Sequence, residues 1–194
     1  MSKLSMKQIR KNIEKVIVGK EEVVDLFMTA LLAEGHILVD DVPGLGKTML
    51  SKTFAKSIEC SFQRIQFTPD LQPNDVTGFN YYNQKSGEFV FKQGPVMSNV
   101  VLTDEINRGV PRTQSSLLEV MEERQVTVDG KTYQLEEPFI VIATQNPVEL
   151  EGTFPLPEAQ LDRFLLKIEM GYPNMDEEVE ILRRFKSANP YQEL

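Results

Sequence analysis

The strongest constraint on the fold lies in residues 36–59, where an apolar segment, a glycine loop and a helical pattern follow one another. The segment HILVD is short, apolar and partly β-branched, which predicts a buried strand. The loop DVPGLGKT comes next, and a helix is expected from about Lys47 to Glu59. Strand, glycine loop and helix in this order form the context in which a phosphate-binding loop occurs.

Similar apolar segments recur along the chain and are separated by helical patterns. The expected further strands are 64–67, 99–103, 139–144 and 164–170, and the other expected helices are 7–18, 21–33 and 112–123. Five short apolar strands separated by helices predict an α/β fold, with a parallel sheet between two layers of helices. Alternating patterns in 78–94 and 125–135, the second with Asp129 and Gly130 at its centre, predict two inserted β-hairpins.

Composition narrows the class of protein. A chain of 194 residues with 41% hydrophobic residues most simply forms one domain, and its charge of −8 disfavours binding to nucleic acids or anionic membranes. The single cysteine, Cys60, cannot form an internal disulfide. Because no apolar run is long enough for a transmembrane segment and no signal peptide is evident, we expect a cytoplasmic protein. The single histidine, His36, is expected to be structural.

The loop DDVPGLGKTML carries residues suited to holding phosphate. Gly44 and Gly46 let the backbone close around a phosphate, Lys47 supplies charge, and Thr48 supplies a hydroxyl for Mg²⁺. Asp41 stands where the G-x-x-x-x-G-K-[ST] pattern has its first glycine, and Asp is among the residues that tolerate positive φ. Taken alone, Gly-Lys-Thr at the start of a helix is a weak signal.

A second element strengthens the hypothesis of a nucleotide site. The segment NVVLTDEINR is an apolar strand that ends in Asp104 and Glu105. The end of a parallel strand delivers both carboxylates to the same crevice as the phosphate loop. The first can hold the water shell of Mg²⁺ and the second can polarise an attacking water. A solvated acidic pair is the alternative, which the preceding apolar run and the earlier Gly-Lys-Thr disfavour.

Polar residues near two other strands are weaker candidates. Asn146, at the end of FIVIATQNP, can reach both the water and the γ-phosphate, but a turn-forming Asn is the plainer interpretation of that residue alone. Arg163 precedes the last strand, and by itself it is interpreted as a surface ion pair with Asp162. Arg108 and Arg112 are expected to be ordinary surface charges.

Taken together, the ordered segments VPGLGKT, LTDEINR, ERQVTVDG, IATQNP and FPLPEAQLDRFLL resemble the MoxR family of AAA+ ATPases. The resemblance covers nearly the whole chain with compatible spacing. It implies that ATP and Mg²⁺ are the cofactors, that Asp104 and Glu105 form the Walker B pair, and that Asn146 is the first sensor. It also implies that Arg163 is an arginine finger for the neighbouring subunit. The implied nucleotide contacts are Val18 and Gly19 at the adenine, and Pro43, Gly44, Leu45, Gly46, Lys47, Thr48 and Met49, with Thr48 and Asp104 at the metal.

The resemblance carries further expectations about organisation and partners. It implies a homo-oligomeric ring, by analogy a hexamer, that remodels or matures partners containing a von Willebrand factor A domain. It places an AAA+ α/β nucleotide-binding domain at 1–175, and makes 176–194 the last helix, leading toward a helical lid outside this sequence. The competing hypothesis is a nucleotide-binding scaffold or switch with negligible turnover. A GTPase is disfavoured because no Asn/Thr-Lys-x-Asp motif appears.

Overall fold

A parallel five-stranded sheet forms the centre of the protein in the computed structural model, which describes residues 5–40, 42, 44–147, 151–187 and 189–194. The strands lie in the order β2-β5-β8-β1-β9, and every neighbouring pair is parallel. Their bounds are β1 (Ile37–Asp40), β2 (Phe62–Gln66), β5 (Val100–Asp104), β8 (Ile140–Gln145) and β9 (Leu166–Ile168). The predicted α/β class with a five-stranded parallel sheet is confirmed.

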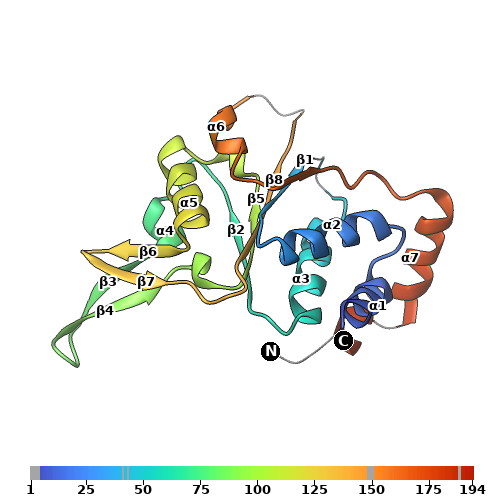
Figure 1. The fold of residues 1–194 in the computed structure, drawn as a ribbon, viewed down its shortest axis with the longest axis horizontal. Helices are drawn as coiled ribbons and strands as arrows, with labels where there is room; N and C mark the ends of the chain where they lie inside the picture. Colours follow the sequence, from blue (N-terminus) through green and yellow to red (C-terminus); the bar gives the residue numbers. More distant parts are fainter. Residues whose placement is uncertain (1–4, 41, 43, 148–150, 188) are drawn as a thin grey trace.

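Helices cover both faces of this sheet. Figure 1 shows the sheet nearly edge-on, with α1, α2, α3 and α7 on one side and α4 and α5 on the other. The helices are α1 (Met6–Val16), α2 (Glu21–Leu32), α3 (Lys47–Ser57), α4 (Pro73–Thr77), α5 (Pro111–Glu123), α6 (Glu158–Leu161) and α7 (Met175–Ser187). Short 3-10 turns are η1 (Pro95–Met97), η2 (Ile106–Arg108) and η3 (Pro190–Glu193). Within the described ranges, no helix is long and apolar enough to cross a membrane.

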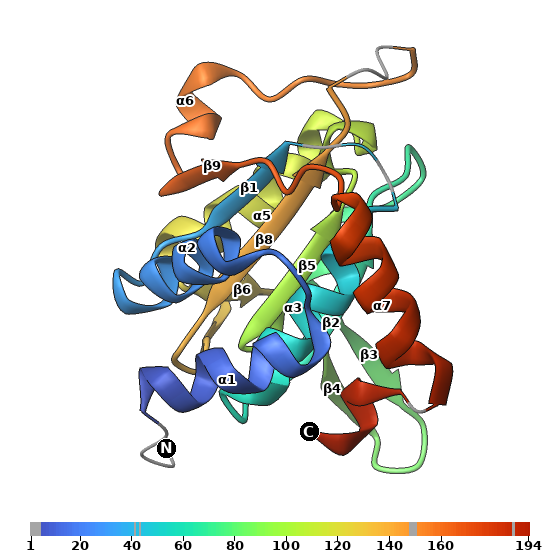
Figure 2. The ribbon, with the colours of Figure 1, turned by 90° about the vertical axis from the view of Figure 1, so that its right-hand side faces the viewer.

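Alternating side chains of the strands divide the core into two layers. Ile37 and Val39 of β1 pack with residues of α1, α2 and α3, whereas Leu38 between them packs with Leu117 and Leu118 of α5. Successive side chains of a strand point to opposite faces, so a strand covered on both sides must be apolar throughout. This explains why the central strands read as continuous apolar segments, and Figure 2 shows them lying between the two helical layers.

Two β-hairpins project from the face that carries α5 (Figure 1), as predicted. They are formed by β3 (Gly78–Asn83) with β4 (Glu88–Gln93), and by β6 (Gln125–Val128) with β7 (Lys131–Gln134). Asp129 and Gly130 have φ of 49° and 77°, as a two-residue hairpin turn with a left-handed backbone requires. The hairpins contact each other through the Asn80–Asp129 hydrogen bond of 2.8 Å and the stacked rings of Phe91 and Tyr133.

Some predicted boundaries were wrong. The last strand spans three residues instead of 164–170, because Phe164 still belongs to the turn after α6, where its amide donates to the Leu161 carbonyl. Helix α4 was missed because its five residues are too few to show helical periodicity. A capping box formed by Gln72 and Asp75 and a proline in its first turn define that helix locally.

Candidate nucleotide-binding site

A cavity of about 220 Å³ lies at the carboxyl edge of the sheet, where ligands bind in open α/β folds. The wall is formed by the ends of β2, β5 and β8, the residues that follow β1, β5 and β8, and the start of α3, which meet because β5, β8 and β1 are adjacent in the sheet. Its lining residues are Gly44, Gly46, Lys47, Thr48, Arg64, Gln66, Asp104, Glu105, Thr144, Gln145 and Asn146. The phosphate loop, the acidic pair and Asn146, predicted from separate segments, therefore meet in one cavity.

The phosphate loop turns sharply into α3. Gly44 and Gly46 have φ of 90° and 82°, in the left-handed region where an L side chain is strained. Gly46 is the N-cap of α3, and Lys47 and Thr48 are its first two residues. The first amide groups of a helix have no partner within it and form a positive end, and no acidic residue lies in the first turn of α3. This end of the helix is suited to an anion.

A left-handed residue places two consecutive carboxylates in the cavity. Asp104 ends β5 and is buried, whereas Glu105 has φ of 56° and ψ of 49° before the turn η2. In a continuing strand the two side chains would point to opposite faces. The break in conformation lets both line the cavity. A non-glycine residue in this region costs free energy and is found preferentially at functional sites.

Thr144, on β8, joins the two acidic residues. Its hydroxyl donates to Asp104 Oδ1 over 3.2 Å and accepts the backbone amide of Glu105 over 3.0 Å. Because Thr144 is buried between the strand ends, both its hydrogen bonds fix the turn that follows β5. Thr144 was not among the predicted site residues.

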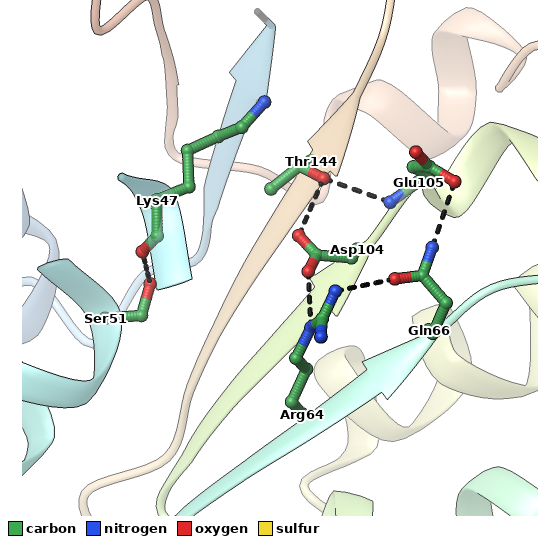
Figure 3. A network of polar contacts seen from close by, with 7 residues as sticks. All are labelled: Lys47, Ser51, Arg64, Gln66, Asp104, Glu105 and Thr144. Carbon is green, nitrogen blue, oxygen red and sulfur yellow. Dashed lines mark hydrogen bonds and ion pairs between the residues drawn. The ribbon is translucent and has the colours of Figure 1, made fainter. Parts of the chain in front are cut away.

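Strand β2 supplies two further residues that the sequence analysis missed. Arg64 Nε lies 2.6 Å from Asp104 Oδ2, and Nη2 of the same guanidinium donates to Gln66 Oε1 over 2.8 Å. Gln66 Nε2 donates in turn to Glu105 Oε2 over 2.9 Å, and Figure 3 shows this chain of contacts. A signal was present: Arg64 and Gln66 alternate with buried Ile65 and Phe67, so their side chains lie on the same face of the strand.

Arg108, expected to be an ordinary surface charge, forms an ion pair with one carboxylate of the site, although it does not line the cavity. Its Nε lies 3.2 Å from Glu105 Oε2, one 3-10 turn away. Glu105 is thus contacted by Gln66 from β2 and by Arg108 from η2. Both contacts reach the same oxygen, Oε2, and orient the carboxylate.

Other predicted site residues lie away from the cavity lining. Val18 and Gly19 lie between α1 and α2, where a Cβ on Gly19 would come within 2.0 Å of Glu177 of α7. Lys20, the next residue, donates to the carbonyls of Gly171 and Tyr172, so this segment borders the chain leading into α7. Leu45 and Met49 are also absent from the described lining. The predicted residues Asp41 and Pro43 lie outside the described residues.

Arg163 is not among the described residues that line the cavity of its own chain. Its guanidinium pairs with Glu122 of α5 and not with Asp162, so the partner expected for a surface ion pair was wrong. Asp162 is next to Arg163 in the chain and is the C-cap residue of α6. The Nε of Arg163 is buried without a hydrogen-bond partner among the described residues.

The residues of the cavity fit a polyphosphate and a divalent cation. A volume of about 220 Å³ is smaller than the roughly 300–1,000 Å³ of pockets that enclose whole ligands, which matches a phosphate tail better than a complete nucleotide. In the described ranges no three His, Cys, Asp or Glu side chains cluster to hold a metal. Mg²⁺ characteristically binds through one or two protein oxygens together with substrate phosphates, and Thr48 and Asp104 offer such oxygens. Fold and cavity together define a P-loop nucleotide-binding domain.

Comparison with known proteins agrees with this class. The model of the ATPase family associated with various cellular activities (AAA) matches residues 36–166. Protein YeaC of Bacillus subtilis is 58% identical over a region that covers 94% of this chain and 57% of YeaC. Chaperone MoxR1 of Mycobacterium tuberculosis is 49% identical over a region that covers 92% of this chain and 47% of MoxR1. A solved structure of a candidate ATPase from Cytophaga hutchinsonii superposes with a TM-score of 0.88 at 48% identity, covering 96% of this chain and 57% of the other.

The chain therefore belongs to the AAA family of ATPases, and within it to the MoxR group. It spans about half the length of the curated relatives that it matches.

Proposed function

We propose that this domain binds ATP with Mg²⁺ and hydrolyses the bond between the β- and γ-phosphates. The observation that carries the proposal is the meeting of Lys47, Thr48, Asp104, Glu105 and Asn146 in one cavity at the start of α3. A phosphate loop alone would support binding. The additional carboxylate, Glu105, is what favours hydrolysis, because a scaffold that only holds nucleotide has no need of it.

Each residue has a role that its position supports. The amides at the start of α3 and the ammonium of Lys47 hold the phosphates, while Thr48 and Asp104 hold the metal with its waters. When bound, Mg²⁺ supplies positive charge that neutralises the phosphate oxygens. Glu105, oriented by Gln66 and Arg108, accepts a proton from the attacking water.

The proposal extends to assembly and partners. We propose a homo-oligomeric ring, hexameric by family resemblance, in which Arg163 completes the site of the neighbouring subunit. Energy from hydrolysis would serve chaperone-like remodelling or maturation of protein partners, with von Willebrand factor A domain proteins as the partner class. We further propose that 1–175 is the nucleotide-binding unit and that α7 leads toward a lid domain. The exposed apolar residues Leu182 and Met175 of α7 support a role in packing against such a unit.

The test separates binding from hydrolysis. Lys47→Ala should abolish binding of a fluorescent ATP analogue, whereas Glu105→Gln should bind ATP with near-parental affinity and release no phosphate. Lys52→Ala, on the same helix but outside the cavity lining, is the matched control for Lys47. Turnover by Glu105→Gln at the parental rate would contradict the role of Glu105. Binding by the parental protein without any turnover in its assembled form would favour the scaffold.

A further inference from the structure

Arg64 occupies one side of the carboxylate assigned to the metal. Its Nε lies 2.6 Å from Asp104 Oδ2, a short charge-assisted contact, and the other oxygen, Oδ1, accepts the Thr144 hydroxyl. Asp104 is largely buried, with 12% of its side chain exposed, whereas 49% of the Arg64 side chain is exposed. A carboxylate buried at a strand end needs a charge partner, and Arg64 supplies it.

The position of Arg64 conflicts with the binding of a cation. A guanidinium and Mg²⁺ both seek the negative charge of Asp104, and like charges brought together in a confined site repel each other. Buried ion pairs are costly to break only if one partner is left without compensation. An arriving metal would compensate Asp104, and the exposed, flexible Arg64 side chain can turn toward solvent.

We propose that Arg64 is an internal counter-cation that competes with Mg²⁺ for Asp104, so that metal loading requires displacement of Arg64. This inference rests on the proposed binding of ATP with Mg²⁺ and adds a residue that sets the metal dependence of that site. Nucleotide phosphates assist the exchange, because they add negative charge that favours Mg²⁺ in the same cavity. In their absence, the pair with Arg64 keeps the carboxylate neutralised.

Displacement of Arg64 from Asp104 would also affect Glu105. Arg64 also donates to Gln66 Oε1, and Gln66 donates to Glu105 Oε2 (Figure 3). When Arg64 leaves Asp104, the amide of Gln66 loses the donor that fixes its orientation. Metal loading is thereby coupled to the residue that orients the water-polarising carboxylate.

The experiment measures metal dependence and not turnover. Binding of a fluorescent, non-hydrolysable ATP analogue is titrated in EDTA and at increasing Mg²⁺, for the parental protein and for Arg64→Met. We expect the Mg²⁺ concentration for half-maximal enhancement of binding to fall about fivefold in Arg64→Met, the scale of a partly exposed ion pair. Binding of Mn²⁺ without nucleotide, followed by the electron paramagnetic resonance of free Mn²⁺, should become tighter in the same variant.

Lys167→Met is a matched control. Lys167 Nζ lies 2.6 Å from Asp40 Oδ2, and the carboxylate is 11% exposed, so this pair has nearly the geometry and burial of the Arg64–Asp104 pair. It lies on β9 and β1, and neither residue lines the cavity. Its loss should leave the Mg²⁺ requirement unchanged. Arg64→Lys keeps the charge with fewer donors and should give an intermediate requirement, which preserves the test if Arg64→Met does not fold.

Three outcomes would overturn the inference. If the Mg²⁺ requirement of Arg64→Met and Arg64→Lys equals the parental one, Arg64 does not compete with the metal. If binding of the analogue in EDTA is weakened while the Mg²⁺ enhancement is unchanged, Arg64 is a phosphate ligand instead. If the parental protein itself shows no Mg²⁺ enhancement, the proposed function has failed, a result distinct from failure of the competition alone.

Discussion

The backbone amide of Val141 donates to Nδ1 of His36 over 3.0 Å, across the sheet from β8 to the residue before β1. Because Nδ1 accepts this bond, the ring proton resides on Nε2, which donates to the Met121 carbonyl over 3.2 Å. Both nitrogens of the neutral ring are thus used, as expected for a structural histidine. The pKa of His36 is lowered to about 4, chiefly because the ring is buried; the bond to the Met121 carbonyl opposes this effect, and the charge of the nearby Arg124 adds to it.

The depressed pKa of His36 predicts a loss of stability in mild acid. The unfolded chain, with an ordinary histidine pKa of 6.5, binds a proton before the folded protein does. Above about pH 6.5, His36 therefore has little effect on the free energy of unfolding. As the pH falls from 6.5 toward 4 the free energy of unfolding decreases, by about 2 kcal/mol at pH 5. Urea unfolding at pH 7.5 and pH 5 measures this loss. His36→Asn removes the titrating group, and an equal loss in that variant would refute the assignment.

Gly94, which follows β4, and Gly130, in the turn of the second hairpin, should differ in their response to alanine. A Cβ on Gly94 would lie 2.3 Å from the Val76 carbonyl and 2.4 Å from the Gly78 amide, backbone atoms that cannot move aside independently. Gly94→Ala should cost about 3 kcal/mol, the upper range for overpacking. A Cβ on Gly130 would contact no atom within 4 Å, so Gly130→Ala should destabilise the protein by only about 1 kcal/mol, the cost of a φ of 77° for an L residue. The free energies of unfolding of the two variants test this difference. A larger loss in Gly130→Ala than in Gly94→Ala would contradict the predicted crowding at Gly94.

Gln66 should act on turnover through the orientation of Glu105. Replacing Gln66 with Leu removes the 2.9 Å hydrogen bond to Glu105 Oε2, and kcat should fall about tenfold, the scale of one hydrogen bond to a charged group. The KM for ATP should change by less than about twofold, because the bond does not involve the phosphate loop. Gln63→Leu, an exposed glutamine on the same strand, is the matched control. An equal fall in kcat in both variants would show that leucine on β2 disturbs the strand generally, and that the bond from Gln66 to Glu105 has no specific role.

The sequence predicted the sheet well because its central strands are covered on both faces. Val100, Leu102 and Ile140 belong to unbroken apolar segments that leave little choice of structure. Asp104 and Glu105 were found for the same reason, since polar residues at the end of such a segment are conspicuous. Their assigned roles, like those of Asn146 and Arg163, remain predictions.

The contacts within the site could not be predicted because they cross between strands distant in sequence. The pairing of Gln66 with Asp104 in the β2–β5 register brings Arg64 near the acidic pair, and only the strand order reveals it. The ion pair of Arg108 with Glu105 was not predicted because the left-handed conformation of Glu105 has no sequence signature. The predicted partner of Arg163 was wrong because Asp162 is its neighbour in the sequence, whereas the fold brings Glu122 of α5 next to it.

Arg163 should complete the active site of a neighbouring subunit. It does not line the cavity of its own chain, and its ion pair with Glu122 leaves 33% of the arginine side chain exposed. In an assembly-competent form of the protein, Arg163→Ala should nearly abolish turnover while sparing ATP binding. Loss of an arginine finger costs on the order of 10³–10⁵ in rate in GTPases. Glu122→Gln removes the pairing partner but keeps Arg163, and should retain most of the activity.

Mixing variants distinguishes action in trans from a local structural role. Arg163→Ala and Glu105→Gln should each be inactive alone, since each lacks one part of every site. In mixed rings, an Arg163→Ala subunit keeps its own Glu105 and can use the arginine of a Glu105→Gln neighbour, so phosphate release should partly return. The recovered activity should decline on dilution as the rings dissociate. If labelled subunits exchange and the mixture stays inactive, Arg163 serves the ion pair with Glu122 and not the neighbouring site.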